Sequence, residues 1–157
     1  MKWFINFLEK IGRKRVILDR ESNEPYLERY YVFLKDRTWF PFNVFLHKFL
    51  KSDPDDLHDH PWSYATLILK GGYYEWTPLF DAAGAKIGEV QHWRGPGHFR
   101  RCSATSYHRI ELDPQIECWT LFMPGKQQRE WGFLTKQGRS NVWVQHEQYL
   151  SQRSMKT

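Results

Sequence analysis

Two histidines have the residue type and spacing that allow them to bind one metal ion. His58 and His60 are two positions apart in the chain. On an extended segment, residues two apart point to the same side, with backbones about 6.6 Å apart. Both imidazoles of the pair can then converge on one ion, because metal–nitrogen bonds are about 2.0–2.2 Å long. A pair of ordinary surface histidines at the start of a strand is the alternative interpretation of this segment alone.

The residues after this pair are typical of a strand. The run Ser63–Lys70 is rich in β-forming residues and ends at Gly71–Gly72, which reads as a turn. His58 and His60 resemble the first motif of the cupin family, G-x5-H-x-H-x3/4-E-x6-G. The glycine pair stands at the spacing of the closing glycine of that motif. The family's glutamate is missing, because its position is held by Tyr64 or Ala65.

A second segment resembles the other cupin motif, G-x5-P-x-G-x2-H-x3-N. Gly97 opens it, Ser103 and Thr105 replace the proline and glycine, and His108 falls at the histidine position. The final asparagine is replaced by Leu112. The spacing of the motif is therefore kept while several of its residues differ.

The resemblance covers roughly residues 26–145 and implies an all-β fold, the cupin double-stranded β-helix or jelly-roll barrel. Four short segments of the chain also resemble a small cupin group found in phages and bacteria. These segments are Phe45-Leu46-His47, Leu57 through Trp62, His108-Arg109-Ile110 and Trp131-Gly132-Phe133.

The resemblance implies that His58, His60 and His108 bind a divalent ion and leave positions open for water, oxygen or substrate. Imidazoles suit several metals; we expect Fe(II) first, with Zn, Ni or Mn as alternatives. Without the glutamate, the neutral three-histidine set resembles that of the thiol dioxygenases, a cupin branch. A neutral ligand set leaves more positive charge on the ion and favours anionic substrates. The predicted function is a non-haem iron, dioxygenase-like oxidoreductase acting on a small anionic molecule.

Two carboxylates could replace the missing ligand, Glu75 after the glycine pair and Glu117 after His108; an exposed acid near a hairpin is the alternative for Glu75. Asp59 alternates with the histidines and should point to the other face. Tyr64 shares the parity of His58 and His60, so it is the candidate catalytic residue.

The Tyr64 phenol could donate to a substrate, or act as acid or base if its pKa were lowered. The alternative for Tyr64 is an aromatic that fills the barrel. His47 is expected to be a hydrogen-bonded core residue. Arg29 could face the pocket and hold a carboxylate or phosphate.

Two other functions stay open. The missing glutamate would fit a non-enzymatic ligand-binding or regulatory module. A cupin-type sugar epimerase or isomerase would use a histidine as base, but it needs a histidine–carboxylate pair, and none is evident in the sequence. Nucleic-acid binding is not favoured, because the aromatic residues recur with strand periodicity and so favour core filling over a stacking surface.

Composition places the protein in a broad class. The chain has 157 residues with a net charge of +5, and its 8 Trp, 8 Tyr and 11 Phe suit strands and pocket walls. Cys102 and Cys118 are too few for a disulfide framework. The sequence lacks a stretch of the roughly 20 apolar residues that span a membrane, and its start does not resemble a secretion signal. We therefore expect a cytoplasmic protein.

The elements that must position these residues are short strands separated by turns. We expect one domain, 1–157, with an N-terminal helix and lead-in (1–25), a β-barrel (26–145) and a C-terminal tail (146–157). Early strands are expected over Tyr26–Lys35 and Trp39–Leu50, and a short helix over His146–Ser151. Residues 2–12 have apolar side chains at helical spacing. Their aromatic face is large enough to predict a homodimer contact.

Overall fold

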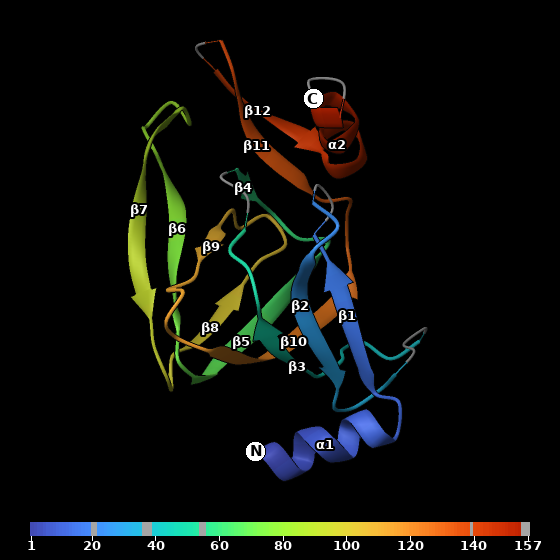
Figure 1. Ribbon diagram of the computed structural model, residues 1–157. Helices are drawn as coiled ribbons and strands as arrows, with labels where there is room; N and C mark the ends of the chain where they lie inside the picture. The colour runs from blue at the N-terminus through green and yellow to red at the C-terminus, as the bar shows by residue number, and fades with distance from the viewer. Residues whose placement is uncertain (20–21, 36–38, 54–55, 139, 155–157) are drawn as a thin grey trace.

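The computed structural model describes residues 1–19, 22–35, 39–53, 56–138 and 140–154. Strands account for most of the regular structure, and a helix lies at each end of this part of the chain: α1 (Lys2–Lys10) and α2 (His146–Ser154) (Figure 1). The strands are β1 (Lys14–Leu18), β2 (Pro25–Tyr31), β3 (Phe45–Phe49), β4 (Leu57–His58), β5 (Trp62–Lys70), β6 (Tyr73–Phe80), β7 (Lys86–Arg94), β8 (Phe99–Cys102), β9 (Arg109–Glu111), β10 (Cys118–Gln127), β11 (Gly132–Gln137) and β12 (Ser140–Gln145). The predicted all-β fold with a short N-terminal helix is confirmed.

The strands form one large antiparallel sheet and two small ones. The large sheet has the order β1-β2-β3-β10-β5-β8, and the small sheets have the orders β12-β11-β4 and β7-β6-β9. Because β10 pairs with both β3 and β5, strands far apart in the sequence are hydrogen-bonded neighbours. Figure 1 shows the large sheet in the lower half of the molecule, with the β6–β7 hairpin on one side and β11, β12 and α2 above it.

The two faces of the large sheet have different roles. On the outer face, Leu8 of α1 packs with Tyr30, Leu46 and Trp119, all of which are buried. Residues of opposite parity on the same strands, such as His47, line an interior cavity. Strand alternation therefore separates a helix-covered face from a cavity-lining face.

Smaller apolar clusters join the large sheet to the other two layers. Ile68 and Cys118 of the large sheet pack against Tyr73 and Ile110 of the β6–β9 sheet. A further cluster under α2 consists of Phe133, Val144 and Tyr149. These contacts fix the two small sheets around the cavity.

The glycine pair after β5 is required by the backbone. Gly71 has φ 69° and Gly72 has φ 153°, a region that side-chain-bearing residues rarely adopt. A Cβ atom on Gly71 would also lie 2.2 Å from the carbonyl oxygen of Glu117. The expected turn is therefore present, and it joins β5 to β6.

The structure differs from the sequence prediction at four places. The strand expected over Tyr26–Lys35 is β2 and ends at Tyr31. The lead-in contributes a strand, β1, at the edge of the large sheet. The strand expected over Trp39–Leu50 begins only at Phe45, since the Asn43 side chain bonds both backbone groups of Leu34 and holds a loop. The C-terminal helix extends to Ser154; residues 155–157 of the expected tail lie outside the described residues.

Helix α1 presents aromatic residues to solvent, as its sequence pattern predicts. Trp3 is 79% exposed and stacks on Phe7, which is 46% exposed. The homodimer contact expected at this face stays a prediction. Within the described residues, neither helix has the length and hydropathy needed to cross a membrane.

Candidate metal centre

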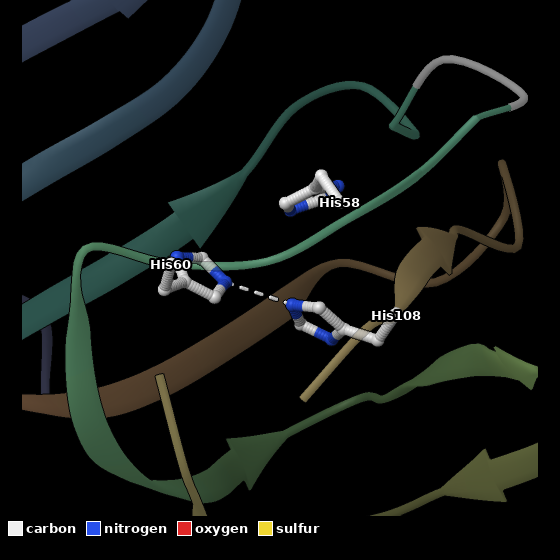
Figure 2. Close-up of side chains that lie close together, drawn as sticks. All are labelled: His58, His60 and His108. Carbon is white, nitrogen blue, oxygen red and sulfur yellow. Dashed lines mark hydrogen bonds between the residues drawn. The ribbon is translucent and has the colours of Figure 1, made fainter. Parts of the chain in front are cut away.

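A pair of backbone hydrogen bonds brings the two histidine segments together. The His58 amide donates to the carbonyl of His108 at 2.9 Å, and the His108 amide donates back to the carbonyl of His58 at 3.0 Å. His60 follows two residues later and donates from its amide to Ala104 at 3.3 Å. The three predicted histidines therefore lie together, although His108 is remote in the sequence (Figure 2).

The three imidazole rings form a nearly equilateral triangle. Their centroids are 5.2 Å apart for His58–His60, 5.0 Å for His58–His108 and 5.1 Å for His60–His108. An ion about 2.1 Å from one nitrogen of each ring, at tetrahedral angles, would place the ring centres about 5.2 Å apart. One nitrogen from each histidine also lies within 4.8 Å of the other two. The donor set and its spacing thus fit a metal ion.

His60 and His108 face each other through their Nε2 atoms, which are 2.9 Å apart (Figure 2). At the same tetrahedral angles, two nitrogens that each lie about 2.1 Å from one ion are about 3.4 Å apart. These two rings therefore need to separate by only about 0.5 Å to share an ion. The His58 ring lies beside the line that joins them.

Glu75 holds the other nitrogen of His108. Its Oε1 lies 3.0 Å from His108 Nδ1, and its Oε2 accepts from Arg94 Nε at 2.9 Å and also pairs with Arg100. Burial would raise the pKa of Glu75, but the hydrogen bond and charge of His108 and the two arginines lower it to about 2. An ionised Glu75 accepts a hydrogen bond from the Nδ1–H group of His108, which keeps the proton on Nδ1 and leaves the Nε2 lone pair for a ligand bond.

Both sequence interpretations of Glu75 are therefore incorrect. It is neither an exposed acid at a hairpin nor one of the clustered ligand groups, because it is 2% exposed and lies behind His108. The other candidate acid, Glu117, is also remote from the cluster: it pairs with Lys48 and Lys70 at the surface. The described carboxylates thus leave the candidate ligand set as three neutral histidines.

Asp59 points away from the histidines, as its parity predicts, and anchors their segment. It is fully buried and accepts hydrogen bonds from the Gly132 amide at 2.7 Å and from Trp143 Nε1 at 3.1 Å, with Arg129 2.7 Å away. Position 132 has no room for a side chain, because a Cβ there would lie 2.1 Å from the carbonyl oxygen of Val144 on the paired strand. The tie fixes the backbone on both sides of Asp59.

Tyr64 lies next to two of the histidines, as expected. Its ring centroid is 4.7 Å from that of His60, and its hydroxyl is 3.3 Å from His108 Nε2. Burial raises the pKa of Tyr64 well above its usual value, and the neighbouring Cys102 adds to this. The phenol therefore stays protonated near neutral pH and can donate a hydrogen bond, but it is not a base. Its catalytic role stays a prediction.

The cluster opens into a cavity of about 430 Å³, within the size range of small-molecule sites. Aromatic residues dominate its wall: Tyr26, Phe49, Trp62, Tyr64, Tyr73, Phe122, Trp131, Phe133 and Tyr149. Polar groups contributed by the large sheet include Arg29 and His47. Aromatic surface around these polar groups lowers the local dielectric constant and so strengthens their electrostatic interactions.

His47 is a buried, hydrogen-bonded residue, as expected, but it also lines the cavity. It is 4% exposed, its Nε2 accepts from Arg29 Nε at 3.0 Å, and its ring stacks on Phe122 with centroids 5.1 Å apart. Arg29 lines the cavity too, which confirms that it faces inwards.

Sequence reasoning missed the residues that support the cluster. The roles of Glu75, Arg94 and Arg100 depend on pairing between strands, and no local spacing reveals it. One usable signal was present: a single acid between aromatic residues in Tyr73-Tyr74-Glu75-Trp76 indicates a side chain on a buried face.

Comparison with solved structures identifies the fold. A polyketide cyclase, RemF from Streptomyces resistomycificus, is similar with a TM-score of 0.56 and 15% identity, over 82% of this chain and 84% of that one. A cupin-2 domain from Rhodospirillum rubrum is similar with a TM-score of 0.53 and 11% identity, over 90% and 82%. The chain has the cupin fold.

A third similar structure is Fe(II)-HppE with the alternative substrate (S)-1-HPP. Its TM-score is 0.51 at 12% identity, and the match covers 73% of this chain and 57% of that one. No protein-family model and no curated protein matches the sequence. Structural similarity at such low sequence identity establishes the fold but not the function, which has to be argued from the site.

Replacing Glu75 by glutamine is expected to weaken metal binding about 10- to 100-fold, because the partner that orients a metal-binding histidine is lost. Glu89→Gln is the matched control. Glu89 is a half-buried acid in the same small sheet and pairs with Lys86 and Arg109 but with no histidine. Metal affinity is measured by competition with a chelator, with thermal melting to confirm folding. Equal affinities in the two variants would show that Glu75 does not orient His108.

The metal-free protein is expected to lose stability as the pH falls below about 6.5, the pKa of histidine in an unfolded chain. Burial lowers the pKa of both His47 and His60 well below that value, helped by Arg29 for His47 and by the neighbouring histidines for His60. Just below pH 6.5 the unfolded chain binds more protons than the folded chain does. The stabilisation that is present above pH 6.5 is therefore lost as the pH falls towards the pKa of these histidines in the folded protein. Each histidine can contribute up to about 1.4 kcal/mol per pH unit.

Urea unfolding at about pH 7.5 and 5.5 measures this loss. His47→Gln, whose amide oxygen can still accept from Arg29 but does not titrate, should show a smaller loss than the unchanged protein. The same pH dependence in both proteins would contradict the assignment to His47.

Proposed function

We propose that this protein is a metal-dependent cupin enzyme: a non-haem Fe(II) oxidoreductase, dioxygenase-like, acting on a small anionic molecule. The observation that carries the proposal is the triangle of His58, His60 and His108, which lines a cavity with a largely aromatic wall. Three protein ligands leave coordination positions free, which distinguishes catalytic from structural metal sites.

The donor chemistry supports iron without excluding other ions. Neutral imidazoles suit Fe, Zn, Ni and Cu, and the lack of a carboxylate leaves the full charge of the ion to attract an anion. Fe(II)-HppE shows that a protein of similar fold holds Fe(II). When bound, such an ion would supply one-electron chemistry and a positive charge in the cavity wall.

The surrounding residues have separate tasks in this proposal. Glu75 keeps the proton of His108 on Nδ1, so Nε2 stays a ligand atom. Tyr64 presents a neutral phenol beside the same Nε2 and can donate a hydrogen bond to a substrate oxygen or sulfur. Phe122 and the other aromatic residues of the wall offer apolar surface to the body of the substrate.

A second candidate function follows from one contact that the sequence did not reveal. His108 and Glu75 form the buried histidine–carboxylate pair that a metal-independent epimerase or isomerase requires, with the Tyr64 hydroxyl 3.3 Å from the same histidine. The sequence does not reveal this pair, because the pairing of β6 with β9 brings Glu75 next to His108. In this function His108 would be the base, held in one tautomer by Glu75. The activity of such an isomerase would persist after a chelator removes the metal, whereas the activity of the proposed oxidoreductase would be lost.

His108→Ala is expected to remove bound metal as completely as His58→Ala or His60→Ala, because all three rings share one ion. His92→Ala, which removes an exposed histidine of β7, is the matched control and should keep full occupancy. The measurement is metal content after Fe(II) loading of protein purified without a histidine tag. If His108→Ala keeps full occupancy while the other two variants lose it, the three-histidine site is wrong.

Oxygen uptake by the loaded protein tests the reaction. A panel of small thiols, carboxylates and phosphonates is offered with an oxygen electrode, and each hit is repeated with the His60→Ala variant. Uptake that needs both iron and His60 supports the oxidoreductase. Stoichiometric metal without turnover would favour the ligand-binding or regulatory module, and turnover of a sugar derivative in metal-free protein would favour the isomerase.

A further inference from the structure

A row of polar side chains crosses the cavity-facing side of the large sheet. In the strand registers Arg15 of β1 lies opposite Arg29 of β2, Arg29 opposite His47 of β3, and His47 opposite Thr120 of β10. All four residues line the cavity. Interior faces of sheets are normally apolar, so a polar row here needs a physical reason.

The two arginines place like charges directly opposite each other. Such cross-strand pairs are destabilising unless an anion lies between or beside them. Among the described residues, neither arginine forms an ion pair with a carboxylate. The two acids in the same cavity wall have other partners: Asp19 lies 3.7 Å from the Lys51 ammonium, and Asp53 accepts from the Ile110 amide at 2.6 Å and from Tyr26.

Arg29 is also held in one orientation. Its Nε–H donates to His47 Nε2 at 3.0 Å, its guanidinium lies 4.6 Å from the centre of the Phe45 ring, and the Tyr31 phenol interacts with it. His47 is locked in turn by stacking between Phe45 and Phe122. A guanidinium fixed in this way loses little entropy when it binds an oxyanion through its remaining N–H groups.

We propose that Arg15 and Arg29 form an oxyanion subsite that binds a carboxylate or phosphate group of the substrate. The inference rests on the proposed function, since it names the groups that recognise the small anionic molecule.

The position of Phe122 sets the shape of that molecule. Its ring centroid is 5.1 Å from that of His47 and 6.4 Å from that of His60, so one aromatic ring separates the arginine row from the histidine cluster. The substrate then has its oxyanion at one end, a body that lies along Phe122, and its reacting group at the histidines. A molecule with an acidic group directly on the reacting atom would not reach both ends.

The test measures binding of inorganic phosphate, and separately of acetate, by isothermal titration calorimetry. Metal-free protein and the His108→Ala variant are used so that no ion can bind the anion. Both are expected to bind at least one probe, with a dissociation constant on the order of 1 mM. Preference for phosphate or for acetate identifies which oxyanion the substrate has.

Arg29→Gln should weaken that binding about tenfold or more, as expected for loss of charge-assisted hydrogen bonds. Arg15→Gln, at an exposed position of the edge strand β1, should weaken it several-fold. Arg101→Gln removes an exposed arginine of β8, on the face away from the cavity, and should bind as the unchanged protein does. Arg29→Lys keeps the positive charge but loses the planar set of guanidinium N–H donors, so its affinity for the anion should be intermediate. Thermal melting confirms that each variant is folded.

Equal binding by Arg15→Gln and Arg101→Gln would overturn the subsite, as would binding that is present only in metal-loaded protein. Absence of binding by both probes would overturn it as well. These outcomes are separate from failure of the proposed function, because metal occupancy of the three histidines is measured without any anion.

Discussion

The reciprocal backbone hydrogen bonds between His58 and His108 are the constraint on which the site depends. They hold two chain segments that belong to different sheets, and without them the three imidazoles would have no common target. The fold secures this contact from both sides. Asp59 ties the first segment to Gly132 and Trp143, and Glu75 ties the His108 ring to two arginines. Two buried acids therefore position three neutral ligands.

The distribution of charge around the cavity follows from burial. A buried carboxylate is stable only when donors or cations surround it, and Glu75 and Asp59 both meet this condition with arginine and other donors. Both acids lie behind the histidine segments and have their own partners. In contrast, Arg15 and Arg29 lie opposite each other at the cavity, and among the described residues neither forms an ion pair with a carboxylate. The cavity wall thus combines three histidines with two arginines, a set of groups suited to an anionic ligand.

Much of the architecture could be predicted from the sequence because local patterns determine it. Alternation and turn residues indicated most strands, and the two motif spacings placed His108 beside His58 and His60 although both motifs are degenerate. The features that could not be predicted depend on contacts between residues that are far apart in the sequence. The edge strand β1 has no alternation clear enough to identify, Asn43 replaces ladder bonds by side-chain bonds, and the partner of Glu75 is chosen by strand pairing. The sequence located the histidine cluster but not the acids and arginines that support it.

The central claim is that one ion binds all three histidines. Anomalous diffraction from crystals of Fe(II)-loaded protein, recorded on both sides of the iron absorption edge, tests it most directly. The account predicts one anomalous peak about 2.0–2.2 Å from a ring nitrogen of each of His58, His60 and His108, with Glu75 still bonded to His108 Nδ1. A peak bound by only one of the three, a peak bound by Glu75, or no peak between the rings would contradict it.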